Sequence, residues 1–297
     1  AGSSSIYTGD SGDPNLGRVM YQHSTNSWDI YSGDCLGMQI CCDEVVYFPG
    51  KIGLGVVPTA GQCLYKSIQM GPQGLLLRSP ETTAKVNSET FFGNNIKYTY
   101  AGGVVHAFAD EASYIYQNGG RVVFYTAECA AADASFNGGE TMFIYPNGAV
   151  TKPCAPAFLV GDSTQGANVT GDGTAYDIPY ETEMFDQGND FSSTTFTAPV
   201  AGRYLLSMQQ GPSGLLAGHT NTLIRIVTSN RPYYSTINQG GSGSIVSGGY
   251  AQIALTVIAD MDAGDTADTR IAVYNGTKVI DIGGNAAYMW WSGALIA

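Results

Sequence analysis

Short apolar runs bounded by turn residues follow one another along the whole chain. Examples are the segments 45–48, 120–125, 222–227 and 252–258, which are rich in β-branched and aromatic residues. Runs of this length and composition are typical of β-strands. No stretch combines a long apolar stripe of helical period with capping residues, so helix content should be low. The pattern predicts an all-β protein.

The pattern also repeats. Residues 67–76 (SIQMGPQGLL) recur about 140 residues later as 207–216 (SMQQGPSGLL). Further matches fall in the same order along both halves: 58–64 with 199–205, 121–125 with 270–274, and Gly138, Gly139 and 148–150 with Gly283, Gly284 and 293–295. Collinear matches with a period near half the chain length indicate two copies of one domain. The predicted organisation is an N-terminal arm at 1–16, a first domain at 17–150, a linker at 151–155 and a second domain at 156–297.

The last strand of each copy is apolar on both faces. In 287–293, alternation points Met289 and Trp291 to one side and Tyr288 and Trp290 to the other. A strand with one solvent-exposed face would carry polar residues on that face. Either a neighbouring subunit or a loop of the same chain must cover the second apolar face. We predict a subunit interface, formed by Phe143, Tyr145, Tyr288 and Trp290.

Composition narrows the class of partner. The chain holds 39 Gly and 19 Tyr, and only 13% of its residues are charged, which suits short strands joined by tight turns. The net charge is −12 and the 13 Lys and Arg residues are scattered singly, which argues against nucleic-acid binding. No apolar run is long enough to cross a membrane, so no membrane partner is expected.

Cysteine usage is uneven, because all six cysteines lie at or before Cys154. A disulfide framework that defined the repeated domain would be present in both copies. Free buried thiols therefore compete with one or more disulfides, for which Cys35 and Cys42 are the local candidates. A Cys-x-x-Cys pair is missing, which makes a zinc site a weak hypothesis.

Candidate chemistry is sparse. The serine-hydrolase pattern Gly-x-Ser-x-Gly is absent, and His23, His106 and His219 have no neighbouring nucleophile or carboxylate pattern. We therefore expect no enzymatic activity. The acidic segment 260–268 could supply Ca²⁺ with oxygen ligands, or form a solvated turn, and no other cofactor is expected. The candidate ligands are Asp260, Asp262 and Asp265.

The second copy carries a recognisable set of motifs. These are 156–160 (PAFLV), 191–207 (FSSTTFTAPVAGRYLLS), 263–265 (AGD) and 291–296 (WSGALI). Together they resemble the globular head of complement C1q and the C1q/tumour-necrosis-factor-like family, over essentially all of 156–297. The first copy departs further, since Cys63 stands where the second copy has Tyr204, and Pro146 stands in place of Trp291.

The resemblance implies two tandem C1q/TNF-like jelly rolls and a homotrimer. The expected function is that of a structural virion protein at the surface of a tailed bacteriophage, as a capsid decoration or cement protein, or as a fibre or knob. The polar arm 1–16 would attach to the capsid or to other virion proteins. Two alternatives are a secreted, extracellular C1q-like module that recognises glycans or proteins, and a double-jelly-roll capsid subunit.

Overall fold

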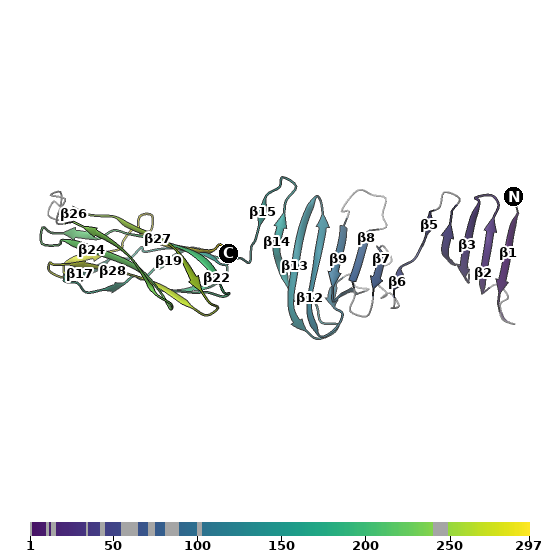
Figure 1. Ribbon diagram of the computed structural model, residues 1–297, viewed down its shortest axis with the longest axis horizontal. Coiled ribbons are helices and arrows are strands. Elements are labelled where there is room, and N and C mark those ends of the chain that lie inside the picture. The colour runs from purple at the N-terminus through teal and green to yellow at the C-terminus, as the bar shows by residue number, and fades with distance from the viewer. Residues whose placement is uncertain are drawn as a thin grey trace. The chain divides into compact units, whose positions relative to one another are not determined.

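The computed structural model describes residues 2–9, 12, 16–33, 35–41, 45–54, 65–70, 75–80, 89–99, 103–239 and 249–297. Every regular element within these ranges is a β-strand, which confirms the all-β prediction. In this part of the chain no helix is long and apolar enough to span a membrane. Two compact units are present, Ala1–Lys152 and Pro153–Ala297, and the division falls inside the predicted linker (Figure 1).

The second unit is a sandwich of two sheets. One sheet has the order β19-β16-β30-β22-β27 and the other the order β20-β21-β28-β24-β25. The bounds of the first sheet are Thr182–Asp186 (β19), Ala157–Gly161 (β16), Trp290–Leu295 (β30), Gly202–Gln210 (β22) and Ile253–Met261 (β27). Those of the second are Phe191–Ser192 (β20), Thr195–Thr197 (β21), Thr266–Tyr274 (β28), Asn221–Thr228 (β24) and Pro232–Asn238 (β25).

The order of these strands identifies the fold. The first strand, β16, pairs with the last, β30, and the consecutive strands β21 and β22 lie in different sheets, as do β27 and β28. This alternation of consecutive strands between two layers is that of a jelly roll. Four shorter strands complete the unit as a small sheet: β17 (Gly166–Thr170), β29 (Ile280–Ile282), β23 (Ser213–Leu215) and β26 (Gly249–Tyr250), while β18 (Tyr176–Asp177) pairs with β28.

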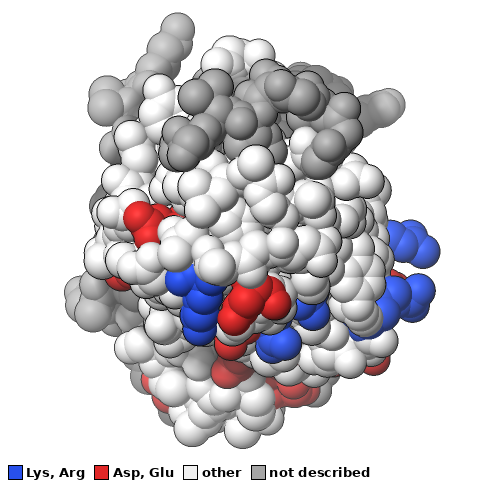
Figure 2. All heavy atoms as spheres, turned by 90° about the vertical axis from the view of Figure 1, so that its left-hand side faces the viewer, with Lys and Arg blue, Asp and Glu red and all other residues white. Residues whose placement is uncertain are grey.

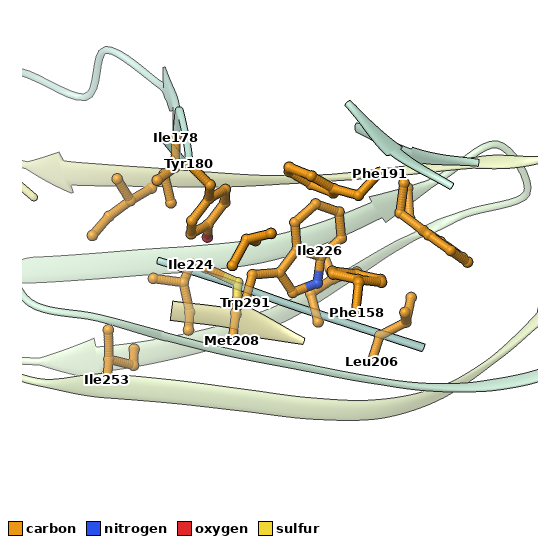
Figure 3. Close-up of a cluster of buried hydrophobic side chains, with 14 of the residues drawn as sticks. Phe158, Ile178, Tyr180, Phe191, Leu206, Met208, Ile224, Ile226, Ile253 and Trp291 are labelled. Atoms are coloured by element: carbon orange, nitrogen blue, oxygen red, sulfur yellow. The ribbon is translucent and has the colours of Figure 1, made fainter. Parts of the chain in front are cut away.

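Alternation along β22 and β30 builds the core of the second unit. Leu206 and Met208 of β22 are fully buried between the sheets, and so is Trp291 of β30 (Figure 3). The Trp291 ring meets Phe158 and Phe191 edge-on, with ring centroids 5.1 and 5.6 Å apart. Such edge-to-face contacts add to the free energy gained by burying large rings. The motifs that carry the family resemblance thus supply the core.

The first unit has a different architecture. Its N-terminal sheet follows the chain order, β1-β2-β3-β4-β5, with bounds Ser3–Thr8, Gly17–Gln22, Ser27–Ser32, Cys35–Ile40 and Val46–Tyr47. A second sheet has the order β15-β14-β13-β12-β9-β8-β7-β6. Its bounds run from Ile52–Leu54 (β6), Tyr65–Met70 (β7), Leu75–Pro80 (β8) and Glu89–Asn94 (β9) to Asp110–Asn118 (β12), Arg121–Ala130 (β13), Gly139–Ile144 (β14) and Val150–Thr151 (β15). The hairpin β10 (Ile96–Tyr98) and β11 (Val104–His106) forms a separate two-stranded sheet, and the buried Ile96 packs it against Ala112 and Ala127 of the large sheet.

The prediction of a second jelly roll at 17–150 is therefore wrong for the described residues. The repeated motif shows the difference: Gln69 of β7 pairs with Leu76 of the next strand, whereas the matching Gln209 of β22 pairs with Ala254 and Trp290 of distant strands. Tyr204 and Trp291 fill the core of the second unit. Because the first copy has Cys63 and Pro146 there, it lacks the side chains that would hold two sheets together.

The N-terminal arm also differs from the expectation. Ser3–Thr8 form β1, which pairs antiparallel with β2 of the same chain. These residues of the predicted arm 1–16 thus belong to the same sheet as β2, which lies beyond the boundary predicted at residue 16. A pattern of three serines before Ile6 and Tyr7 is short, yet it suffices for an edge strand once β2 offers free backbone groups.

Some predictions fall outside the described residues. These include the repeat segment 58–64 with Cys63, and Cys42 of the candidate disulfide. Cys35 and Cys129 are free, exposed thiols.

Candidate self-association surface of the second unit

The outward face of the sheet that contains β22 and β30 is the candidate functional surface. Leu205, between the buried Tyr204 and Leu206, points outward and is 40% exposed. Strand pairing aligns its neighbours on the same face in three rows. These rows are Ala157–Ala294–Leu205–Ile258, Phe185–Leu159–Ser292–Ser207–Thr256 and Gly161–Trp290–Gln209–Ala254.

The three rows contain no charged residue. The next row on this face, beyond Leu205 and Ile258, contains the charged pair Arg203 and Asp260. In the middle of the face the hydroxyls of Ser207 and Thr256 lie 2.7 Å apart and satisfy each other across the strands. Polar groups already paired in this way can be buried at low cost. The face therefore has the composition of an interface rather than of a solvated sheet surface.

A shallow groove of about 490 Å³ lies at one side of this face. Its lining is almost entirely apolar, with Ser292 as the polar exception. The residues are Leu159, Met184, Phe185, Ala286, Ala287, Trp290 and Ser292. Met184 and Phe185, on the edge strand β19, are both nearly half exposed, which leaves large apolar side chains available to a partner.

The predicted interface residues lie on different elements. Trp290 is half-buried in the groove, Tyr288 is exposed in the turn before β30, and Met289 and Trp291 point into the core, as alternation predicts. Phe143 of β14 and Tyr145 just beyond it are half-buried and stack with centroids 5.8 Å apart. Sequence reasoning missed Leu159, Phe185, Leu205 and Ile258. The succession Leu205-Leu206 in one strand is the same two-sided apolar signal that pointed to Trp290.

The candidate calcium ligands form a turn. Asp265 accepts hydrogen bonds at one carboxylate oxygen from the backbone N–H of Asp262 and from the Asn230 side chain, at 2.8 and 2.9 Å. Asp260 ends β27 in register with Arg203. Within the described ranges no three His, Cys, Asp or Glu side chains gather where they could hold a metal ion. The segment connects β27 and β28, which belong to different sheets, and Asp265 stabilises that connection.

Two histidines are fully buried and have structural partners. His219 accepts a hydrogen bond from the Leu216 backbone N–H at Nδ1, so its Nε2 carries the proton donated to the Thr277 carbonyl. His106 contacts the Asp110 carbonyl through Nδ1 and the Asn137 side chain through Nε2. His219 thus joins two loops, His106 joins β11 to β12 and to the loop of Asn137, and neither imidazole contacts a hydroxyl or thiol nucleophile in these bonds.

One buried carboxylate was not foreseen from the sequence. Asp162, directly after β16, is 1% exposed, and both of its carboxylate oxygens lack a hydrogen-bond partner among the described residues. Burial, aided by the nearby charge of Glu181, raises the pKa of Asp162 from 3.8 to about 7. The residue follows an ordinary apolar strand, and nothing in the local sequence marks it.

This carboxylate predicts a pH-dependent stability of the second unit. Because the folded-state pKa lies above the unfolded one, the contribution of Asp162 is most favourable below about pH 4 and is lost as the pH rises through about 7. Asp162→Asn should therefore stabilise the protein at pH 8 by on the order of 2 kcal/mol and leave it unchanged near pH 4. Urea unfolding across this range measures the effect. Glu181→Gln should move the loss of stability that accompanies ionisation of Asp162 to lower pH, because it removes a nearby negative charge. Identical pH profiles of stability for Asp162→Asn and wild type would contradict the prediction.

Comparison with known proteins gives structural neighbours only. No family model matches the sequence, and no curated protein matches it. Among solved structures, the globular domain of zebrafish complement 1qA is similar over 48% of this chain and 98% of its own, with 14% identity and a TM-score of 0.34. Murine APRIL is similar over 48% of this chain and 99% of its own, with 8% identity and a TM-score of 0.36. The jelly-roll assignment rests on the strand order described above.

Proposed function

We propose that the chain is a non-catalytic, homotrimeric structural protein of a virus particle, a decoration protein or the knob of a fibre on a tailed bacteriophage. The observation that carries the proposal is the uncharged outward face of β16, β30, β22 and β27. In a chain of net charge −12, a broad face with no charge allows identical subunits to meet without like-charge repulsion. Burying Leu205, Ile258 and the groove beside Trp290 supplies the driving force.

The fold of the first unit distinguishes the proposed decoration or knob protein from a double-jelly-roll capsid subunit. A double-jelly-roll capsid subunit requires two jelly rolls, and the sequential strand order of the first unit contradicts that alternative. The jelly roll of the second unit, called here the head, follows a separate β-sheet unit in the chain. This order suits a protein that projects from a particle surface.

A binding role for the same head is the second candidate. In Figure 2 the Lys, Arg, Asp and Glu side chains gather mainly in the middle and lower part of the view, so part of this end of the second unit carries little charge, and Tyr250 of β26 is 52% exposed. Such a surface would recognise uncharged glycans or proteins through stacking and hydrogen bonds rather than through charge.

Two measurements test the proposal. Light scattering of the purified chain should give a mass three times 31.3 kDa. Antibodies against the second unit should decorate intact virions purified from the source culture in electron micrographs. A monomeric mass would overturn the self-association. A trimer found free in the medium and absent from particles would favour the binding module instead.

A further inference from the structure

The N-terminal sheet β1–β5 is amphipathic. Two rows of side chains cross it on one face, and nearly every member is large and apolar. The rows are Ile6–Val19–Ile30–Met38 and Tyr21–Trp28–Ile40–Val46. Strand positions two residues apart share a face, so the two rows are adjacent and form one surface, called here the apolar face.

The opposite face of the same sheet is mixed: it holds Met20, Leu36 and three tyrosines together with the charged residues of the sheet. Asp29 is 3% exposed and accepts hydrogen bonds from Ser27 and from the Gln39 amide, the latter at 2.8 Å. The Arg18 guanidinium lies 4.0 Å from the centre of the Tyr31 ring. Arg18 and Asp29 are the sole charged residues in β1–β5, and both belong to this face. All charge is thus segregated away from the apolar face.

The apolar face is left open within a single copy. Six of its side chains are between 37% and 68% exposed: Ile6, Val19, Trp28, Ile30, Ile40 and Val46. Since a large apolar or aromatic side chain offers roughly 150–250 Å², six of them at this exposure present roughly 500 Å². A patch of this size matches the largest apolar patch of a typical soluble monomer, and such patches are often functional. The patch supplies more than half of the about 800 Å² that each partner contributes to a standard interface.

We propose that the apolar face of β1–β5 packs against the same face of other copies of this chain, forming a second self-association interface independent of the jelly roll. An uncharged face is self-complementary, because identical copies bring no like charges into contact. Sheets bury a face by interdigitating its alternating apolar side chains with those of neighbouring sheets, which is the pattern that this face presents. This inference rests on the proposed function only for the number of copies. In a trimer, three apolar faces would meet around one axis.

Hydroxyl-radical footprinting of the full-length protein tests this inference with matched side chains. Trp28 on the apolar face is 49% exposed in one copy, while Tyr7 and Tyr47 on the opposite face are 54% and 47% exposed. We expect a severalfold loss of modification at Trp28 relative to both tyrosines at concentrations where the protein is assembled. The loss should disappear on dilution to the monomer.

Variants separate this interface from that of the head. Ile30→Lys should restore modification of Trp28, whereas Tyr47→Lys, on the opposite face of the same sheet, should not. Trp290 reports on the jelly roll in the same experiment. Protection of Trp290 with a reactive Trp28 overturns the inference and leaves the proposed head trimer intact. Protection of Trp28 with a reactive Trp290 supports the inference and overturns the head trimer, and two reactive tryptophans overturn both.

Discussion

Replacing Trp291 with alanine should lower the free energy of unfolding of the second unit by about 3–5 kcal/mol. The side chain is fully buried, and its ring packs against Phe158, Phe191 and Tyr180, with centroids 5.1, 5.6 and 5.8 Å away. Truncation removes the largest ring in the core and leaves a cavity that strands held in two sheets cannot close. Thermal unfolding followed by calorimetry should show the transition roughly 10 °C lower, since about 1 kcal/mol corresponds to 2–4 °C in a domain of this size.

The neighbouring residue provides the control. Trp290 has the same chemistry and occupies the same strand, but it faces outward and is only half-buried. Trp290→Ala should therefore cost the folded unit much less, whatever it does to assembly. Equal losses of stability for the two variants would contradict the assignment of Trp291 to the core and Trp290 to the surface.

The sequence predicted the second unit well because its signals were local and mutually consistent. Alternation along 287–293 separated Met289 and Trp291 from Tyr288 and Trp290, and the motifs at 191–207 and 291–296 indicated a jelly roll. The boundary could be placed near residue 152 because two prolines, Pro153 and Pro156, interrupt the pattern between two apolar strands. Each of these signals acts within a few residues or along one strand.

The prediction of a jelly roll in the first unit was wrong because the repeated motif does not determine strand pairing. A repeated motif such as GPxGLL specifies a turn between apolar segments, but it does not specify which strand pairs with them. Which strands pair depends on the side chains that can fill a common core, and Pro146 cannot fill a core as Trp291 does. Met142 and Phe143 therefore face the two sides of a sequential sheet instead of closing a sandwich. The internal sequence similarity was therefore not accompanied by a common fold.

The candidate surface was found in part. Trp290 and Tyr288 were recognised because a strand apolar on both faces is conspicuous. Leu205 and Ile258 join them only through cross-strand pairing, which a one-dimensional pattern does not contain. Asp162 was missed altogether, because its burial arises from segments remote in the sequence, among them Gly283.

Replacing Trp290 with aspartate should separate the jelly rolls of the proposed trimer while leaving each of them folded. The ring lines the apolar groove with Leu159 and Phe185 on the uncharged face, so a carboxylate there would be buried without a partner in the complex but solvated in the single copy. A penalty of about 3 kcal/mol corresponds to an increase of about 100-fold in the concentration at which the complex dissociates. Sedimentation velocity over a dilution series measures this shift, with near-ultraviolet circular dichroism to verify the fold.

Tyr234→Asp is the matched control for this prediction. Tyr234 is an aromatic residue of similar outward placement, 55% exposed, on β25 of the other sheet of the same jelly roll. The same charge introduced there lies outside the proposed interface and should leave the dissociation concentration unchanged. If both variants dissociate equally, the effect is one of added net charge. If Trp290→Asp assembles as tightly as wild type, the groove lies outside the contact, and the uncharged rows through Leu205 and Ile258 must serve another partner.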